Sequence, residues 1–249
     1  MAQALYYDKP ALLNREKHRR CRIRPSEGYG FARNANSLFV AGVEFNEACK
    51  DYAIVFTRLA GKVTPVVVLG LRTRENLYVD DQGRWDAPYV PAFVRRYPFV
   101  LADLPGRQMG VCIDEAYEGL GESGGEALFD ERGGNTPFLQ NALDFLQRYQ
   151  LEYVRTEAFC RRLEELDLLT AMDARAELAD GRSFTVADLM VVDERKFAAL
   201  PDEQVLSLFR GGELHLVSMH LLSLSNLQRL VDRMAARGGA ELPPPPRPA

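Results

Sequence analysis

Three pairs of adjacent acidic residues are the first groups in this sequence that could do chemistry. Each pair ends an apolar run, and the pairs are Asp80-Asp81, Asp114-Glu115 and Asp193-Glu194. Carboxylates that converge at strand ends can bind Mg²⁺ or Ca²⁺, or can transfer protons. Their spacing does not indicate that the three pairs meet, so we favour the simpler interpretation of solvated strand ends.

A second group combines aromatic rings with guanidinium groups. Trp85, Tyr89, Arg95, Arg96 and Tyr97 lie within residues 85–97. This composition is suited to binding an anion, a sugar or the carboxylates of a partner protein. It is also typical of a helix with an aromatic core face and an arginine face in solvent, and we give that interpretation the greater weight.

The three histidines form a poor set of metal ligands. His215 and His220 are five residues apart, which places them on opposite faces of a strand, and His18 lies among cations. The glycine-rich loops that hold phosphates, G-x-x-x-x-G-K-[ST] and G-x-G-x-x-G, do not occur in the sequence. We therefore expect neither a metal ion nor a cofactor.

One serine lies in a literal G-x-S-x-G motif, at residues 121–125. In α/β-hydrolases this motif joins a strand directly to a helix and exposes the serine hydroxyl. Here seven residues separate Ile113 from Gly121, and the segment after the motif is short and bounded by glycines. We therefore regard a serine hydrolase that uses Ser123 as a weak alternative.

The overall charge of the chain argues against a nucleic-acid partner. The 249 residues carry a formal net charge of -4, whereas binding to phosphate backbones requires a basic surface. Residues 9–24 are an exception, with seven Lys or Arg against one acid, Glu16. This segment could bind an anion or a membrane surface, but it has no interleaved aromatic residues, and we favour a basic segment that lies across an acidic body.

The four cysteines indicate a reducing compartment. Cys21, Cys49, Cys112 and Cys160 are far apart, and three of them lie in apolar stretches where a free thiol packs as a small hydrophobe. Residues 1–13 lack the apolar core of a signal peptide, and no apolar run is long enough to cross a membrane. We expect a cytoplasmic protein without a transmembrane segment.

The first half of the sequence predicts short antiparallel strands. They are expected at residues 38–40, 54–56, 66–69 after Pro65, 77–79, 99–101 and 109–113. A turn is expected at 80–83, and a short helix is expected to begin at Pro88 and to end before Pro98. Little helix separates these strands, and this favours antiparallel pairing.

The second half predicts helices and one hairpin. A long helix is expected from 136 to 166, with Thr136 as its N-cap, Pro137 at its first position and a break near Thr156. A hairpin is expected at 169–192 around Asp180-Gly181. We then expect a helix from Pro201 to Gly211-Gly212, a strand at 214–222, and a final helix from Ser225 or Asn226 to Gly238-Gly239.

These elements predict an α+β fold with an antiparallel β-rich N-terminal half and a helix-plus-β-hairpin C-terminal half. We expect a single module at 1–240, made of a β-rich half at 25–118, a glycine-rich mobile loop at 119–135 and a helix/hairpin half at 136–238. The two halves are expected to share one core. Residues 241–249 are proline-rich and are expected to be a disordered tail.

Many segments of the chain together resemble the bacterial SapC family, which is named after a surface-layer gene cluster. The most distinctive lie between residues 83 and 99 and are Gly83-Arg84-Trp85, Tyr89-Val90-Pro91-Ala92 and Arg95-Arg96-Tyr97-Pro98-Phe99. The other matching segments are 13–19, 31–32, 44–45, 51–52, 54–56, 69–71, 75–80, 112–115, 128–130, 136–139, 192–194, 220–221 and 223–224. The resemblance covers nearly the whole chain and supplies no catalytic residues.

The resemblance implies an accessory protein linked to surface-layer or cell-envelope systems. We therefore expect a non-enzymatic cytoplasmic binding protein whose partner is a protein, a small anion or a sugar. The alternative is an enzyme with a site between the two halves, using His18 or the Asp114-Glu115 pair. The candidate ligand-binding residues are His18, Trp85, Tyr89, Arg95, Arg96, Asp114 and Glu115.

Overall fold

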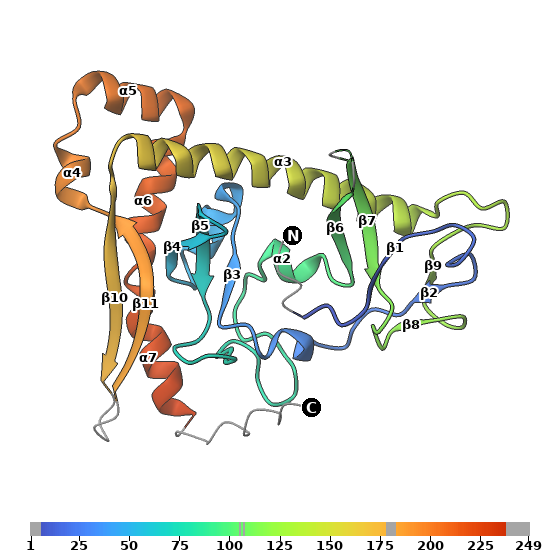
Figure 1. Cartoon of the computed structure of the whole chain (residues 1–249). Coiled ribbons are helices and arrows are strands. Elements are labelled where there is room, and N and C mark those ends of the chain that lie inside the picture. Colours follow the sequence, from blue (N-terminus) through green and yellow to red (C-terminus); the bar gives the residue numbers. More distant parts are fainter. Residues whose placement is uncertain (1–5, 105, 107, 178–182, 238–249) are drawn as a thin grey trace.

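The computed structural model describes residues 6–104, 106, 108–177 and 183–237, and it confirms the predicted α+β class (Figure 1). The expected proline-rich tail, the Asp180-Gly181 turn and the helix stop at Gly238-Gly239 lie outside these residues. Among the residues described, no helix combines the length and the apolar character that crossing a membrane requires.

The largest sheet is antiparallel and has five strands in the order β10-β11-β4-β5-β3. Its strands are β3 (Ser37–Phe39), β4 (Ile54–Leu59), β5 (Lys62–Val68), β10 (Leu169–Glu177) and β11 (Ser183–Val192). The predicted C-terminal hairpin is therefore confirmed, and it joins strands from the first half of the chain. Among the described residues, β11 pairs with β4 through one residue pair, Met190 with Phe56, so the ladder between these two strands is short.

In the hairpin β4–β5, strand β5 begins at Lys62, four residues before the predicted strand 66–69. Ala60 and Gly61 both have positive φ angles, 48° and 81°, which suit a two-residue turn between twisted strands. Pro65 lies inside β5 opposite Phe56, so the expectation that Pro65 precedes the strand was wrong. Its carbonyl oxygen accepts a hydrogen bond from Val40 N at 3.2 Å, so the proline still contributes to the sheet.

Two smaller sheets stand beside the large one. The first has the order β1-β7-β6, and the second has the order β8-β2-β9. Their bounds are β1 (Pro10–Leu12), β2 (Arg22–Ile23), β6 (Phe99–Leu104), β7 (Gln108–Asp114), β8 (Leu120–Gly121) and β9 (Glu126–Ala127). The predicted strands at 99–101 and 109–113 are confirmed as the pair β6–β7.

Three expectations for the first half need correction. The segment 77–79 forms only an isolated bridge, Val79 with Trp85, because Asp80 accepts the backbone N–H of residues 82 and 84 and turns the chain at once. The helix expected from Pro88 is α2 (Ala92–Arg95) and begins four residues later. The predicted glycine-rich loop contains β8 and β9, which flank β2.

The predicted long helix is confirmed as α3 (Pro137–Glu165). The hydroxyl oxygen of Thr136 accepts a hydrogen bond from Leu139 N at 3.3 Å, as an N-cap does, and Pro137 follows at the first helical position. The break expected near Thr156 is wrong. Thr156 Oγ1 donates to Glu152 O at 2.6 Å within the helix and accepts from Gly42 N at 2.8 Å, so this buried threonine connects two elements without bending the helix.

The remaining helices are short. They are α1 (Phe45–Ala48), α4 (Glu194–Ala198), α5 (Asp202–Gly211), α6 (Glu213–Ser223) and α7 (Asn226–Ala236), with the 3₁₀ turns η1 (Gly30–Ala32) and η2 (Gly42–Glu44). The start of α5 after Pro201 and its stop at Gly212, which has a φ of 78°, are confirmed. The strand expected at 214–222 is wrong, because this segment is α6. The last helix is confirmed as α7, although Ser225 makes no side-chain cap.

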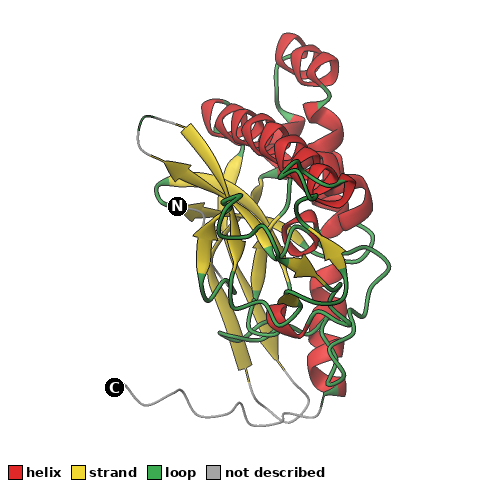
Figure 2. Cartoon of the chain, turned by 90° about the vertical axis from the view of Figure 1, so that its right-hand side faces the viewer, coloured by secondary structure: helices red, strands yellow, loops and turns green. Residues whose placement is uncertain are grey.

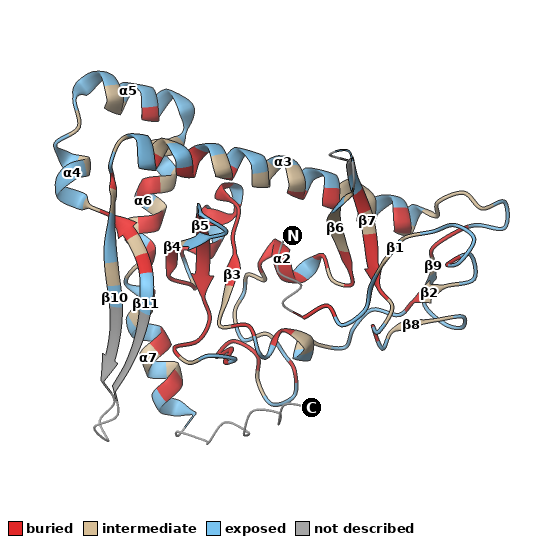
Figure 3. Cartoon of the chain, viewed as in Figure 1, coloured by how far each residue is buried: buried red, intermediate tan, exposed pale blue. Residues whose placement is uncertain are grey.

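The helices gather on one side of the strands (Figure 2), and the buried residues form two hydrophobic clusters. The larger core contains the strands β3, β4 and β5, which Figure 3 shows as mostly buried, with residues from α3, α6 and α7. The smaller core consists of Ile23, Phe99, Ile113, Tyr117, Leu128, Phe129, Leu139 and Leu146. Helix α3 contributes to both cores, so it ties the two ends of the molecule together.

Candidate ligand site

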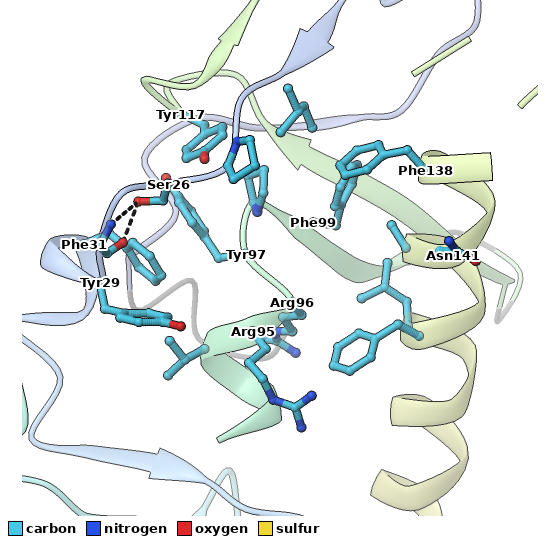
Figure 4. Close-up of a pocket in the computed structure, with 18 residues that line it drawn as sticks. Ser26, Tyr29, Phe31, Arg95, Arg96, Tyr97, Phe99, Tyr117, Phe138 and Asn141 are labelled. Carbon is cyan, nitrogen blue, oxygen red and sulfur yellow. Dashed lines mark hydrogen bonds between the residues drawn. The ribbon is translucent and has the colours of Figure 1, made fainter. Parts of the chain in front are cut away.

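A cavity of about 460 Å³ lies where the two cores adjoin, between the aromatic–arginine segment and the first half of α3 (Figure 4). This volume falls within the range of roughly 300–1,000 Å³ that is usual for small-molecule sites. The lining residues come from four separate parts of the chain: 23–31, 94–99, Tyr117 and 138–146. Of the residues that the structure describes, no Asp or Glu lines the cavity, whereas Arg95 and Arg96 both contribute to it. The cavity is therefore apolar with a positive charge, in a protein whose net charge is negative.

One wall of the cavity is a group of aromatic rings. Tyr97 stacks on Phe31 with ring centroids 4.2 Å apart, and its edge meets Tyr117 at 5.3 Å. Tyr29 lies next to Phe31, at 6.3 Å. The hydroxyl of Tyr117 donates to Arg24 O at 2.7 Å. This bond holds the ring against the residue that directly follows β2. Rings held on several sides in this way form a preorganised apolar surface.

Asp114 fixes Tyr97 from behind the wall. Its carboxylate is fully buried and accepts hydrogen bonds from Asp8 N, Lys9 N and Ala116 N at 2.9–3.1 Å, and from the Tyr97 hydroxyl at 3.2 Å. Burial, together with the neighbouring Asp114 charge, raises the pKa of Tyr97, so its hydroxyl remains a donor at neutral pH. Asp114 therefore positions the site and does not line the cavity.

Arg96 is the most unusual lining residue. Its side chain is only 6% exposed, and its guanidinium carbon lies 3.9 Å from the centroid of Phe93, 5.1 Å from Tyr149 and 5.9 Å from Tyr7. Among the described residues, neither Nε nor Nη2 of Arg96 has a hydrogen-bond partner. A desolvated cation–π contact stabilises by about 2 kcal/mol, while burying an unpaired charge costs several kcal/mol. The three rings therefore offset part of the cost of burying this charge.

Arg95 differs from its neighbour, because it is exposed and bonded. Its Nε donates to Val90 O at 2.9 Å, its Nη2 lies 3.4 Å from the Tyr89 hydroxyl, and its guanidinium carbon lies 5.4 Å from the centroid of Phe145 on α3. Figure 4 shows Arg95 at the end of α2 and Arg96 directly after it, with Phe138 and Asn141 on α3 at the other side of the cavity. Arg95 and Arg96, which the sequence predicts as ligand-binding candidates, thus lie at the same cavity.

Tyr89 and Trp85, also predicted as site residues, support the site from outside the lining. The Tyr89 hydroxyl donates to buried Glu44 Oε1 at 2.7 Å, and the same oxygen accepts Ala92 N at 2.7 Å at the start of α2. Trp85 Nε1 donates to the Tyr52 hydroxyl at 2.8 Å, and that hydroxyl donates to Tyr89 O. These bonds fix the entry into α2 and hence the position of both arginines.

His18 and Glu115 meet elsewhere, in a cluster that closes the N-terminal segment onto β7. Buried His18 accepts Asn14 N on Nδ1 at 3.0 Å, and its Nε2 lies 3.2 Å from Glu115 Oε1. Lys17 and Lys9 pair with the same carboxylate. The hydrogen bond from Lys17, followed by those from Lys9 and His18, lowers the pKa of Glu115 to about 2. Neither His18 nor Glu115 lines the cavity.

The three acidic pairs serve separate local structures. Asp80 accepts backbone hydrogen bonds within its own turn. Asp114 accepts the backbone N–H groups described above. Asp193 caps α4 by accepting hydrogen bonds from Arg195 N and Lys196 N. Among the described residues, no group of three or more His, Cys, Asp or Glu side chains lies close enough to hold a metal ion. Ser123 is exposed in the connection between β8 and β9, and no helix follows it directly.

The basic segment 9–24 makes several bonds to the body of the protein. Arg22 donates to the carbonyl oxygens of Gly124 and Gly125 at 2.7–3.1 Å, and Arg19 donates to Glu131 O at 2.8 Å. Gly125 lets the backbone of β2 approach closely, because a Cβ atom there would lie 2.2 Å from Ile23 O. Part of the positive charge of segment 9–24 is thus engaged in hydrogen bonds to backbone carbonyl oxygens of the protein itself.

Several lining residues were not among the sequence-predicted candidates. The largest are Tyr29, Phe31, Tyr117, Phe138 and Phe145. In the sequence, each of these aromatic residues looks like an ordinary core residue. Only the packing of α3 across the smaller sheets brings the five rings to one cavity. The one sequence signal was their proximity to segments of the SapC resemblance, which include Phe31 and Phe138.

The comparisons with known proteins agree with this resemblance. The family model described as SapC matches residues 13–230, which includes every lining residue of the cavity. No curated protein and no solved structure matches the chain. Because the family model covers most of the sequence, from the basic segment to α7, the chain belongs to the SapC family.

Proposed function

We propose that this chain is a non-enzymatic binding protein that holds a small ligand in the cavity between α2 and α3. We further infer an accessory role in the cytoplasm, linked to surface-layer or cell-envelope systems. The observation that carries the proposal is the cavity itself: about 460 Å³, lined mainly by aromatic and aliphatic side chains, with two arginines and few other polar groups. This combination of a large apolar lining with few polar groups is what ligand-binding sites share.

The arrangement of the acid–base candidates supports binding over catalysis. His18, Asp114 and Glu115 each hold several protein partners, and these bonds fasten the N-terminal segment. A general base needs a lone pair within reach of a substrate proton. The lining of the cavity contains neither histidine nor carboxylate, so the cavity supplies orientation and an apolar environment.

The cysteines support the cytoplasmic location. All four are free thiols, and three are buried. Burial raises the pKa of the Cys160 thiol to about 12, so it remains protonated and unreactive. Free buried thiols are typical of proteins in reducing compartments. The link to envelope systems is supported by the family alone.

A co-purification experiment tests this function. The tagged chain is recovered from separated soluble and envelope fractions of the native cell, and small molecules released on denaturation are identified by mass spectrometry. We expect recovery from the soluble fraction with one compound enriched, and we expect Ala142→Trp to lose that compound, because an indole ring there fills the cavity. Gln147→Trp, at an exposed position on the same helix, is the matched control and should retain the compound.

Several outcomes would count against the proposal. Enrichment of no compound, or equal enrichment by Ala142→Trp and Gln147→Trp, would show that the cavity is not a binding site. Recovery mainly with the envelope would contradict the cytoplasmic location. Conversion of the enriched compound into a product during incubation would favour the alternative, an enzyme.

A further inference from the structure

Helix α5 exposes apolar side chains at the edge of the molecule. It packs on α6 and stands clear of the three sheets in both views of the chain (Figures 1 and 2). Leu208 is its one buried residue, whereas Phe209 is 66% exposed and Leu206 is 46% exposed. Of the aromatic side chains that the structure describes, Phe209 is the only one that is largely exposed. This ring therefore has no covering element within the fold.

The exposed side chains of α5 border a shallow groove. Its lining residues are Asp202, Val205, Leu206 and Phe209 of α5 and Leu214 of α6, and its volume is about 410 Å³. We call these five residues the α5 face. Positions 202, 206 and 209 follow the helical spacing i, i+4, i+7, so they form one row along the helix. An apolar row with charges beside it is typical of a protein–protein contact.

The charges beside the α5 face have opposite signs at its two ends. Asp202 and Glu203 lie in the first turn of α5, and Arg210 lies in the last turn. Among the described residues, no ion pair or side-chain hydrogen bond engages these three charged groups. Asp202 and Arg210 are separated by about 12 Å along the helix axis, so they do not pair with each other. Both charges are available to a partner.

A second copy of the chain supplies the matching pattern. Leu206 lies four residues from Asp202 and four residues from Arg210. If two α5 helices lie antiparallel with Leu206 on the two-fold axis, Arg210 of each copy faces Asp202 of the other copy. The antiparallel orientation also places opposite ends of the two helix dipoles together. In the same register, Phe209 of each copy lies over the groove of the other copy.

We propose that the α5 face is the interface of a homodimer, in which two α5 helices pair antiparallel around Leu206. Phe209 fills the groove of the second copy, and two symmetric Asp202–Arg210 pairs fix the register. This inference goes beyond the proposed binding function and is independent of it, because the ligand cavity lies beside the first half of α3 and shares no residue with the α5 face. The α5 face is small, so we expect a dissociation constant in the micromolar range.

Sedimentation of the whole chain over a series of concentrations tests the interface. The mass of the wild type should rise from 28.0 kDa towards twice that value as the concentration passes through the micromolar range. Phe209→Glu should weaken the dimer at least about 100-fold, because each dimer buries two of these rings. Leu222→Glu is the matched control. Leu222 is 62% exposed on α6 and does not line the groove, so this variant should dimerise as the wild type does. Both positions are exposed, so at low concentration both variants should melt as the wild type does.

Charge reversal tests the register. Asp202→Arg and Arg210→Asp should each weaken the dimer about tenfold, because each replaces two attractive pairs by two repulsive ones. The double variant Asp202→Arg/Arg210→Asp should recover most of the wild-type affinity, because the pairs form again with exchanged signs. The double variant places each charge at the unfavourable end of the helix dipole. A recovered dimer therefore cannot result from a more stable α5.

Three outcomes would overturn the inference. A wild type that remains at 28.0 kDa at the highest concentration would leave the α5 face to a different protein. A Phe209→Glu chain that dimerises as tightly as the wild type would place the interface elsewhere. A double charge-reversal variant that is weaker than either single variant would exclude the antiparallel pairing.

Discussion

His220 is a buried histidine whose partners are backbone groups of two strands. Its Nδ1 donates to Ile54 O on β4 at 2.8 Å, and its Nε2 accepts Val192 N on β11 at 3.0 Å. Since one residue pair joins β4 and β11 in the described part of the chain, the ring connects the two strands beyond their ladder. Burial lowers the pKa of His220 to about 4, because no acidic partner stabilises its cation.

This histidine predicts a loss of stability in mild acid. Between pH 6.5 and 4 the unfolded chain binds a proton that the folded chain excludes, so the free energy of unfolding should fall by roughly 3 kcal/mol as the pH decreases through this window. Urea unfolding at a series of pH values measures the slope. His220→Gln should remove most of the slope, whereas His215→Gln, at an exposed position on the same helix, should not. An identical slope in His220→Gln would assign the effect to other groups.

The sequence predicted part of the candidate site at the scale of single residues. Arg95, Arg96 and Tyr97 could be singled out, because charged and aromatic side chains in a short segment form an unusual pattern. Asp114 was singled out for its carboxylate, but its role is to hold Tyr97. Phe138 and Tyr29 could not be found, since a ring that lines a cavity and a ring that fills a core look the same in a sequence.

At the scale of elements, α6 shows why one prediction failed. Its buried positions are Val217, His220 and Ser223, so two of the three residues that face the interior are polar. Ser223 Oγ accepts Ile54 N at 3.0 Å, and like His220 it satisfies the backbone of β4. A helix that buries polar groups in this way hides the apolar period by which helices are recognised. The helices α3, α5 and α7 and the hairpin β10–β11 kept their ordinary signals and were predicted.

The start of α3 provides a direct test of an element boundary. Besides capping Leu139 N, the Thr136 hydroxyl donates to Ala127 O on β9 at 2.6 Å. Thr136→Ala should therefore lower the free energy of unfolding by about 1 kcal/mol or somewhat more. Thr136→Ser keeps the hydroxyl and should lose much less. Chemical denaturation measures both variants, and equal losses would show that the methyl group, not the hydroxyl, stabilises this boundary.

At the scale of the whole molecule, α3 joins the two cores. Leu139 and Leu146, near its start, belong to the smaller core, and Phe159 and Leu163, near its end, belong to the larger core. The cavity lies beside the first of these segments. A rigid helix shared by both cores should make the chain unfold as a single unit, in line with the predicted single module.

Core substitutions at the two ends of α3 test this expectation. Leu146→Ala and Leu163→Ala should each lower the free energy of unfolding by about 2–5 kcal/mol. Trp85 packs against the larger core, so its fluorescence reports on the end of the molecule that Leu146 does not touch. In both variants the fluorescence and circular dichroism transitions should coincide, and Leu151→Ala, which is exposed, should shift neither. A fluorescence midpoint that Leu146→Ala leaves unchanged would mean that the two cores unfold separately.

The pairing of β4 with β11 has a consequence for biosynthesis. Ile54, Val55 and Phe56 are fully buried in the finished protein, yet their neighbours on one side, β11 and α6, are translated more than a hundred residues later. Until the ribosome has released that part, the nascent chain presents an apolar strand with an open edge, the kind of surface to which chaperones bind and through which chains aggregate. Completion of the large sheet is thus a late step of synthesis, and a chain truncated before β11 leaves one edge of β4 unpaired while β5 still pairs with the other edge.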